Sequence, residues 1–254
     1  MDKYDIYSDI AQRTDGDIYI GVVGPVRTGK STFIKNFMQT LVLPEITSDQ
    51  KRERATDELP QSSSGKTIMT TEPKFIPNEA VEISLSDNTR FKVRLIDCVG
   101  YIVPSALGYI EENMPRMVQT PWFKEPIPFN SAAELGTKKV ITEHSTIGLV
   151  VTTDGSFGDI PRADYVDAEE RVISELKAIN KPFVLILNTA HPDTEQTKAL
   201  ADELAFKYDV PVVSVDCAAL SEADIRKIME NMLFEFPIKE INIRIPGWID
   251  RLAD

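Results

Sequence analysis

A short loop near the amino end of the chain carries the residue types that bind nucleotide phosphates. The stretch GPVRTGKST, residues 24–32, matches the pattern G-x-x-x-x-G-K-S/T and stands between the apolar run DIYIGVV and the helical pattern STFIKNFMQTL. Glycines in such a loop let backbone N–H groups curl around phosphate oxygens, and the following helix points its positive dipole end at them. The lysine adds a cation for the β- and γ-phosphates, and the next hydroxyl ligates Mg²⁺. The binding residues predicted in this loop are Gly24, Arg27, Thr28, Gly29, Lys30, Ser31 and Thr32.

The sequence LIDCVG, residues 95–100, carries a carboxylate suited to the same chemistry. Asp97 stands at the carboxyl end of an apolar run, where it can hold the Mg²⁺ shell, and the Gly100 N–H can reach a γ-phosphate. Thr70 and Thr71 precede this motif, and a threonine there can sense the γ-phosphate and reach the metal. Alternatively they are two loop hydroxyls, and which threonine would act stays open. The predicted metal ligands are Ser31, Thr70 and Asp97.

The order of phosphate loop, threonine, hairpin and D-x-x-G resembles the translation-factor-related class of P-loop GTPases. That class reads guanine with N-K-x-D after its fifth strand. Here the strand PFVLILN runs into Asn188, Thr189, Ala190 and His191, so the lysine and the guanine-specific carboxylate are both missing. Their loss removes the discrimination that hydrogen bonding to the base edge provides. The sequence therefore favours ATP over GTP, with Asn188 still expected at the nucleotide.

A second departure from that class concerns catalysis. Tyr101 stands where many relatives carry the glutamine that orients the attacking water. Arg27, three residues before Lys30, could instead place its guanidinium at the bond between the β- and γ-phosphates, where negative charge develops. The alternative is that Arg27 points to solvent or to a neighbouring subunit. The predicted catalytic residues are Lys30, Thr70, Thr71, Asp97 and Arg27.

Apolar runs rich in β-branched residues alternate with helical patterns along the chain, as in a mostly parallel sheet covered on both faces. Strands are expected at 18–23, 81–85, 91–97, 147–152, 183–188 and 212–215, and helices at 30–43, 132–143, 163–179, 194–208 and 222–234. The turn SDNT within VEISLSDNTRFKVRLID predicts an antiparallel hairpin. We expect an α/β fold, namely a three-layer P-loop NTPase domain whose mostly parallel central sheet carries one antiparallel edge hairpin.

The length and composition of the chain predict its domain organisation and limit the kinds of partner it can have. We expect an N-terminal extension over residues 1–16, a P-loop ATPase domain over 17–236 with a long insertion around 101–131, and the truncated start of a following region over 237–254. The formal net charge of -12 argues against nucleic-acid binding and against direct adhesion to anionic lipid. No apolar run approaches the roughly 20 residues that span a bilayer. The two cysteines suit a reducing cytosol, so we expect a cytoplasmic protein that a partner brings to any membrane.

Longer stretches of the chain resemble the amino-terminal NTPase domain of the stage IV sporulation protein A family. They are GDIYIGVVGPVRTGKSTFIKNFM, DELPQSSSGKTIMTTEPKF, RLIDCVGYIVPSALGY, NMPRMVQTPWFKEPIPF, EHSTIGLVVTTDGSFGDIPRADYVDAEERVI and FEFPIKEINIRIPGW. The resemblance spans nearly the whole chain. It implies that Lys30 is the phosphate-loop lysine, Asp97 the Walker B aspartate, and Thr70 with Thr71 the sensor threonines.

The resemblance implies a spore coat morphogenetic ATPase. Mg²⁺-dependent ATP hydrolysis, slow and coupled to polymerisation, would drive self-assembly into a cytoskeleton-like basement layer on the mother-cell side of the outer forespore membrane. The implied partners are further copies of the chain, a small amphipathic membrane-recruiting peptide and spore coat proteins. Two alternatives stay open, a switch-type GTPase that signals through effectors and a structural module that binds nucleotide without turnover. Trp122 and Phe123 are expected either at a subunit contact or over the domain's own core.

Overall fold

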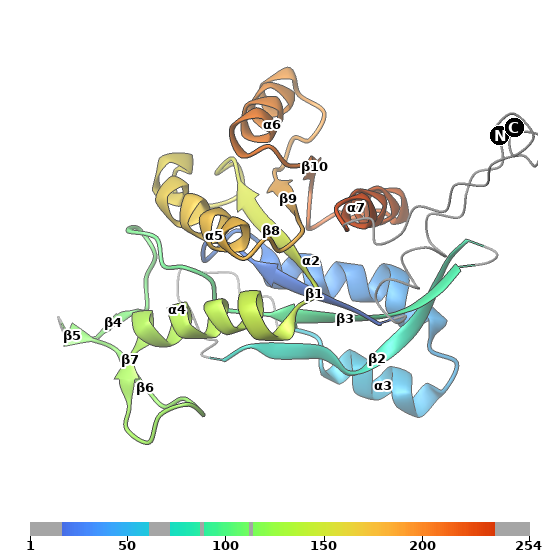
Figure 1. Cartoon of the computed structure of the whole chain (residues 1–254), viewed down its shortest axis with the longest axis horizontal. Helices are drawn as coiled ribbons and strands as arrows, with labels where there is room; N and C mark the ends of the chain where they lie inside the picture. Colours follow the sequence, from blue (N-terminus) through green and yellow to red (C-terminus); the bar gives the residue numbers. More distant parts are fainter. Residues whose placement is uncertain (1–16, 61–71, 87–88, 112–113, 237–254) are drawn as a thin grey trace, which may run out of the picture.

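A six-stranded mixed sheet runs through the centre of the chain, in the order β10-β9-β8-β1-β3-β2 (Figure 1). The structure, a computed structural model, describes residues 17–60, 72–86, 89–111 and 114–236. The strands of this sheet are β1 (Asp17–Val23), β2 (Lys74–Ser86), β3 (Thr89–Asp97), β8 (Ile147–Thr153), β9 (Phe183–Asn188) and β10 (Val212–Val215). All neighbours pair in parallel except β2 and β3, which form an antiparallel hairpin at one edge. The predicted fold class is confirmed.

Helices cover both faces of the sheet and produce two apolar cores. One face packs against α2 (Lys30–Phe37) and α7 (Glu222–Phe234), the other against α4 (Phe129–Lys139), α5 (Val166–Ala178) and α6 (Glu195–Tyr208). Every residue of β8 and β9 is buried, which explains why these strands read as unbroken apolar runs rather than alternating ones. The parallel arrangement brings the carboxyl ends of β1, β3, β8, β9 and β10 to one edge, where open α/β sheets bind ligands.

Helix boundaries differ from the predicted ones where the helical geometry changes. The predicted helix 30–43 is α2 followed by a π-helical turn at Met38–Val42 and a 3₁₀ turn at Leu43–Glu45. A π-helical turn at Val140–His144 likewise extends α4, and the 3₁₀ turn Arg162–Tyr165 precedes α5.

The polar stretch after residue 44 contains a helix that the apolar pattern did not predict. This helix, α3 (Asp49–Asp57), buries one residue, Ala55. It therefore carries no apolar stripe from which its period could be recognised. Strand β2 also begins earlier than predicted, because a register shift between Ile76 and Val81 lets it continue past Pro77.

The segment 101–131 folds into two short hairpins beside α4. Strand β4 (Ile110–Glu111) pairs with β5 (Met114–Pro115), and β6 (Met117–Val118) pairs with β7 (Ile127–Pro128). Figure 1 shows both hairpins extending away from the sheet.

The two aromatic residues Trp122 and Phe123 of this segment differ in their surroundings. Trp122 lies against α4, where a Cβ on Gly136 would come 3.4 Å from its ring and the Lys139 ammonium is 6.0 Å from the ring centre. Phe123 is 47% exposed. A subunit contact through this pair stays a prediction. Residues 1–16 and 237–254 lie outside the described residues, and no helix in the described part is long and apolar enough to cross a membrane.

Candidate nucleotide-binding site

The loop between β1 and α2 has a backbone conformation that depends on its glycines. Gly24 has φ 138° and Gly29 has φ 94°, a region that L-residues rarely adopt. A Cβ on Gly24 would lie 2.3 Å from the Val151 carbonyl oxygen, and one on Gly29 would lie 2.3 Å from Asn188 Nδ2. The loop is thus curled and packed tightly against β8 and β9. No side chain in the described part caps α2, so the N–H groups of its first turn are available to an anion.

Lys30 places its ammonium group inside the curl of the loop. Its Nζ donates to the Pro25 carbonyl oxygen at 2.6 Å and to that of Gly24 at 3.5 Å, and the residue is 5% exposed. Burial lowers the pKa of Lys30, while the nearby Cys98 and Asp97 act in the opposite direction. A charge that is partly stripped of water and held by carbonyl dipoles is prepared to attract phosphate oxygens.

Ser31 and Asp97 form the metal-binding part of the site. Ser31 Oγ donates to Asp97 Oδ2 at 2.8 Å, which joins the first turn of α2 to the end of β3. Asp97 Oδ1 is buried and has no hydrogen-bond partner among the described residues. Burial raises the pKa of Asp97, and the Ser31 hydrogen bond and the Lys30 charge only partly oppose this. An orphaned carboxylate oxygen beside a serine hydroxyl fits Mg²⁺, which usually takes one or two protein carboxylates and completes its shell with water and phosphate.

The segment after Asp97 is attached to the loop through its backbone. Tyr101 N–H donates to the Gly24 carbonyl at 3.2 Å, and the Val26 N–H donates to the Tyr101 carbonyl at 2.8 Å. Gly100 has φ 92°, and a Cβ there would lie 2.6 Å from Lys30 Nζ. Only glycine therefore lets this backbone approach the lysine head group.

The Tyr101 side chain leaves the site. It is buried against α5, where its hydroxyl donates to Glu175 and the Arg171 guanidinium lies 4.3 Å from the ring centre. Tyr101 thus contributes its backbone to the phosphate loop, while its phenol belongs to the α5 side of the core.

Asn188 clamps three loops at the carboxyl edge of the sheet. Its Nδ2 donates to the Thr28 carbonyl at 2.9 Å, and its Oδ1 accepts from the Cys217 N–H at 3.0 Å. The side chain is buried, so both bonds are protected from water. The structure thus places Asn188 in contact with the phosphate loop itself, and its predicted contact with the nucleotide stays a prediction.

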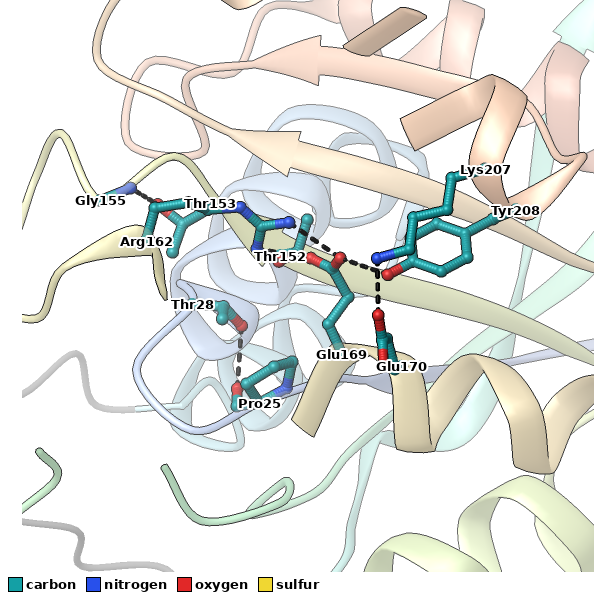
Figure 2. A network of polar contacts seen from close by, with 10 residues as sticks. All are labelled: Pro25, Thr28, Thr152, Thr153, Gly155, Arg162, Glu169, Glu170, Lys207 and Tyr208. Carbon is teal, nitrogen blue, oxygen red and sulfur yellow. Dashed lines mark hydrogen bonds and ion pairs between the residues drawn. The ribbon is translucent and has the colours of Figure 1, made fainter. Parts of the chain in front are cut away.

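The other predicted loop residues take different positions. Thr28 is buried and donates its hydroxyl to the Pro25 carbonyl at 3.0 Å, which stabilises the turn (Figure 2). Thr32 is half-buried in the first turn of α2. Arg27 is half-buried at φ 65°, burial lowers its pKa, and its charge in turn opposes the burial that raises the pKa of Tyr165 to about 12. The Arg27 charge therefore acts on Tyr165, which belongs to the 3₁₀ turn that precedes α5.

A buried ion pair behind the loop was missed by the sequence reasoning. Glu169 on α5 is fully buried and accepts two bonds from Arg162, at 2.6 and 2.8 Å, and one from the Tyr208 hydroxyl at 2.8 Å (Figure 2). It also accepts from the Thr152 hydroxyl at the end of β8. The available sequence signal was its place on the apolar face of α5, three and four residues before Val172 and Ile173. The network fixes the segment between β8 and α5 next to the phosphate loop.

The predicted sensors Thr70 and Thr71 lie outside the described residues. Within the described ranges, no group of three or more His, Cys, Asp or Glu side chains forms a metal cluster. The structure thus brings together Gly24, Lys30, Ser31, Asp97 and Gly100, and the side-chain amide of Asn188 joins them through its bond to the Thr28 carbonyl.

The whole chain is similar to one protein family. The profile of the family described as "Stage IV sporulation protein A, ATPase domain" matches residues 1–237. The protein named stage IV sporulation protein A of Bacillus subtilis (strain 168) is 56% identical over 249 residues, covering 98% of this chain and 51% of that protein. Its namesake in Bacillus anthracis is 57% identical over 252 residues, with the same coverage, and that of Clostridioides difficile (strain 630) is 56% identical over 247 residues. The chain spans about half the length of these curated relatives.

Two solved structures show a distant likeness to this chain. Crystal structures of two SsGBP variants, with proline or serine in place of one glycine, cover 89% of this chain and 58% of theirs at 12% identity. Their TM-scores are 0.48 and 0.47. The α/β fold is established by the strand order and helix layers of the chain itself.

Proposed function

Because the chain belongs to the stage IV sporulation protein A ATPase-domain family, we propose that it binds ATP with Mg²⁺ and hydrolyses it to ADP and phosphate, and that hydrolysis drives self-assembly. The observation that carries the chemical part is the buried Asp97 carboxylate, with one oxygen bonded to Ser31 and the other orphaned beside the phosphate loop. A buried charge is costly unless something pairs with it, so this oxygen is expected to serve a cation.

The residues divide the work by position. Lys30 and the N–H groups at the start of α2 hold the β- and γ-phosphates, while Gly100 lets the backbone after β3 approach the γ-phosphate. Ser31 and Asp97 would hold Mg²⁺, which neutralises phosphate charge when it is bound. Arg27 is proposed to supply a cation in the transition state, and Thr70 with Thr71 to register the γ-phosphate.

The proposals on assembly and location are supported by the family resemblance rather than by the geometry of the site. We propose that copies of the protein polymerise into a basement layer on the outer forespore membrane, in the mother-cell cytoplasm, and that this layer supports the spore coat. A small amphipathic peptide would recruit it, and coat proteins would bind it. Because the chain spans about half of its relatives, these properties are proposed for the whole protein.

Phosphate release from ATP and from GTP tests the proposal directly. The wild-type chain with Mg²⁺ is expected to prefer ATP, and Lys30→Ala to lose activity by about 100-fold or more. Lys35→Ala, a lysine of the same helix that lies outside the loop, is the matched control and should stay within about twofold of wild type.

Three outcomes would count against the proposal. A clear preference for GTP would favour a switch-type GTPase, and binding without phosphate release would favour a structural module. Sedimentation of the full-length protein with ATP, ADP and a non-hydrolysable ATP analogue tests assembly separately. Equal pelleting in all three would remove the link between hydrolysis and assembly.

A further inference from the structure

The strand order fixes the side of the phosphate loop on which the base of a nucleotide must lie. Asp97 ends β3 and Gly100 follows it. Because β3 pairs with β1 on one side, the γ-phosphate and its metal belong there. The strands β8, β9 and β10 extend on the other side of β1. Asn188 ties the loops after β9 and β10 directly to the phosphate loop. A nucleotide whose γ-phosphate faces Gly100 therefore directs its base toward the segments 189–191 and 216–219.

Three successive backbone N–H groups in the loop after β10 are already hydrogen-bonded within the protein. The N–H groups of Cys217, Ala218 and Ala219 donate to Asn188 Oδ1 at 3.0 Å, to Asp216 Oδ1 at 2.8 Å and to the Asp216 carbonyl at 3.1 Å. The side chain of Asn36 on α2 also bonds to this loop, donating to the Cys217 carbonyl at 2.6 Å and to the Ala218 carbonyl at 3.2 Å. The loop is therefore fixed, and Asp216 occupies two of its three successive N–H groups.

The loop after β9 is arranged in the same way. Thr189 N–H donates to the Val215 carbonyl at 3.0 Å, Ala190 N–H to Ser156 Oγ at 2.8 Å, and His191 N–H to Thr189 Oγ1 at 3.0 Å. These six N–H groups, of Thr189, Ala190, His191, Cys217, Ala218 and Ala219, thus each have a partner within the protein. Any of these six donors can reach a purine oxygen only after its present bond has broken.

This pattern of donors distinguishes the two purines. Guanine presents O6, an acceptor that needs an N–H, whereas adenine presents at the same position an amino group that needs an acceptor. Ala218 and Ala219 are exposed, so the occupation of their N–H groups matters to a bound base. A carboxylate offers about four acceptor sites, and the Ala218 N–H uses one of those on Asp216.

We propose that Asp216 determines base specificity, because it withholds the Ala218 N–H from guanine O6 and offers a carboxylate oxygen to the adenine amino group. The proposal rests on the proposed function, since it assigns a specificity residue within the same nucleotide site. It adds an element that disfavours guanine to one that favours adenine, and specific sites commonly combine the two.

Binding of nucleoside diphosphates to the full chain, measured by calorimetry with Mg²⁺, tests the role of Asp216 without hydrolysis. The probes are ADP, GDP and inosine diphosphate, the last of which carries O6 but lacks the 2-amino group of guanine. Asp216→Ala is expected to shift affinity toward GDP and inosine diphosphate, relative to ADP, by about tenfold. Asp216→Asn should shift it less, because its amide oxygen still accepts from the Ala218 N–H. Asp193→Ala removes an exposed carboxylate near the same edge and is the matched control.

The result separates failure of this inference from failure of the proposed function. If Asp216→Ala weakens all three diphosphates equally, Asp216 only stabilises its loop and the inference is overturned. The same holds if Asp193→Ala shifts the preference as much. If the wild-type chain binds none of the diphosphates, both the inference and the proposed function fail.

Discussion

Ser31 Oγ donates to Asp97 Oδ2 at 2.8 Å, which connects the first turn of α2 to the end of β3 across 66 positions of sequence. The contact joins the phosphate-binding helix to the strand that ends in Asp97, the carboxylate that we propose as a metal ligand. It also leaves Asp97 Oδ1 as a buried oxygen with no hydrogen-bond partner among the described residues. The packing of α2 against β3 and the proposed metal binding therefore both depend on the Ser31 hydroxyl and the Asp97 carboxylate.

Substitution of Ser31 is expected to affect binding only through the metal. Ser31→Ala should weaken ADP binding by about tenfold in the presence of Mg²⁺, because one proposed ligand is lost, and change it little in EDTA. Titration calorimetry under both conditions checks this. Thr32→Ala, the neighbouring hydroxyl, should change affinity equally in both. If the loss in Ser31→Ala is the same without Mg²⁺, Ser31 binds phosphate rather than metal.

Neutralising Asp97 is expected to stabilise the ligand-free fold while removing hydrolysis. Burial raises the pKa of Asp97 above its unfolded value of about 3.9, so the native state binds the proton more tightly. The stability gained from this proton is complete below about pH 3.9 and is lost as the pH rises through the raised pKa. At pH 7 Asp97→Asn should thus unfold at a higher temperature than wild type, by about 1 kcal/mol in stability.

Thermal unfolding between pH 5 and 8, without nucleotide or Mg²⁺, measures this difference. The gap between Asp97→Asn and wild type should narrow toward acid, where wild-type Asp97 takes up its proton. A variant less stable than wild type at pH 7 would show that the ionised carboxylate stabilises the site through Lys30 and Ser31.

Two adjacent glutamates of α5 are expected to differ sharply in their effect on stability. Glu169 is buried in the network with Arg162, Thr152 and Tyr208, whereas Glu170 makes a surface pair with Lys207 (Figure 2). Glu169→Ala should cost about 3–5 kcal/mol because it leaves Arg162 without its partner. Glu170→Ala should cost about 1 kcal/mol or less. Urea denaturation of both variants measures the difference, and equal effects would contradict a structural role for the network.

Removing the Tyr101 hydroxyl should leave the chemistry intact. The phenol points to Glu175 on α5, and only the Tyr101 backbone contacts the phosphate loop. Tyr101→Phe is therefore expected to hydrolyse ATP within about twofold of wild type and to lose about 1 kcal/mol of stability. Steady-state phosphate release and thermal unfolding on the same preparation provide the two numbers. A large fall in rate with the fold intact would place the phenol in the reaction.

The polar helix α3 and the role of Asn188 mark where the sequence stopped being informative. Helix α3 has no apolar stripe, so the pattern that identified α2, α5 and α7 had nothing to detect. An asparagine amide can hydrogen-bond either to a base or to a loop backbone, so the residue type alone does not say which of these Asn188 contacts. Its bond to the Thr28 carbonyl spans 160 positions of sequence, so its partner depends on how the sheet is assembled. The sequence likewise showed that Tyr101 replaces a glutamine but not where its side chain points. Only the position of α5, whose Arg171 lies over the Tyr101 ring, shows this.

The sequence by itself determined the phosphate loop, the carboxylate at the end of β3 and the layered α/β fold, because each depends on local spacing or on the period of apolar residues. The tertiary structure decided which of these residues meet. It joined Ser31 to Asp97, Asn188 to the loops after β1 and β10, and Glu169 to Arg162 and Tyr208. These contacts link segments far apart in the chain, and their partners are fixed by strand order and helix packing. No local pattern carries that information.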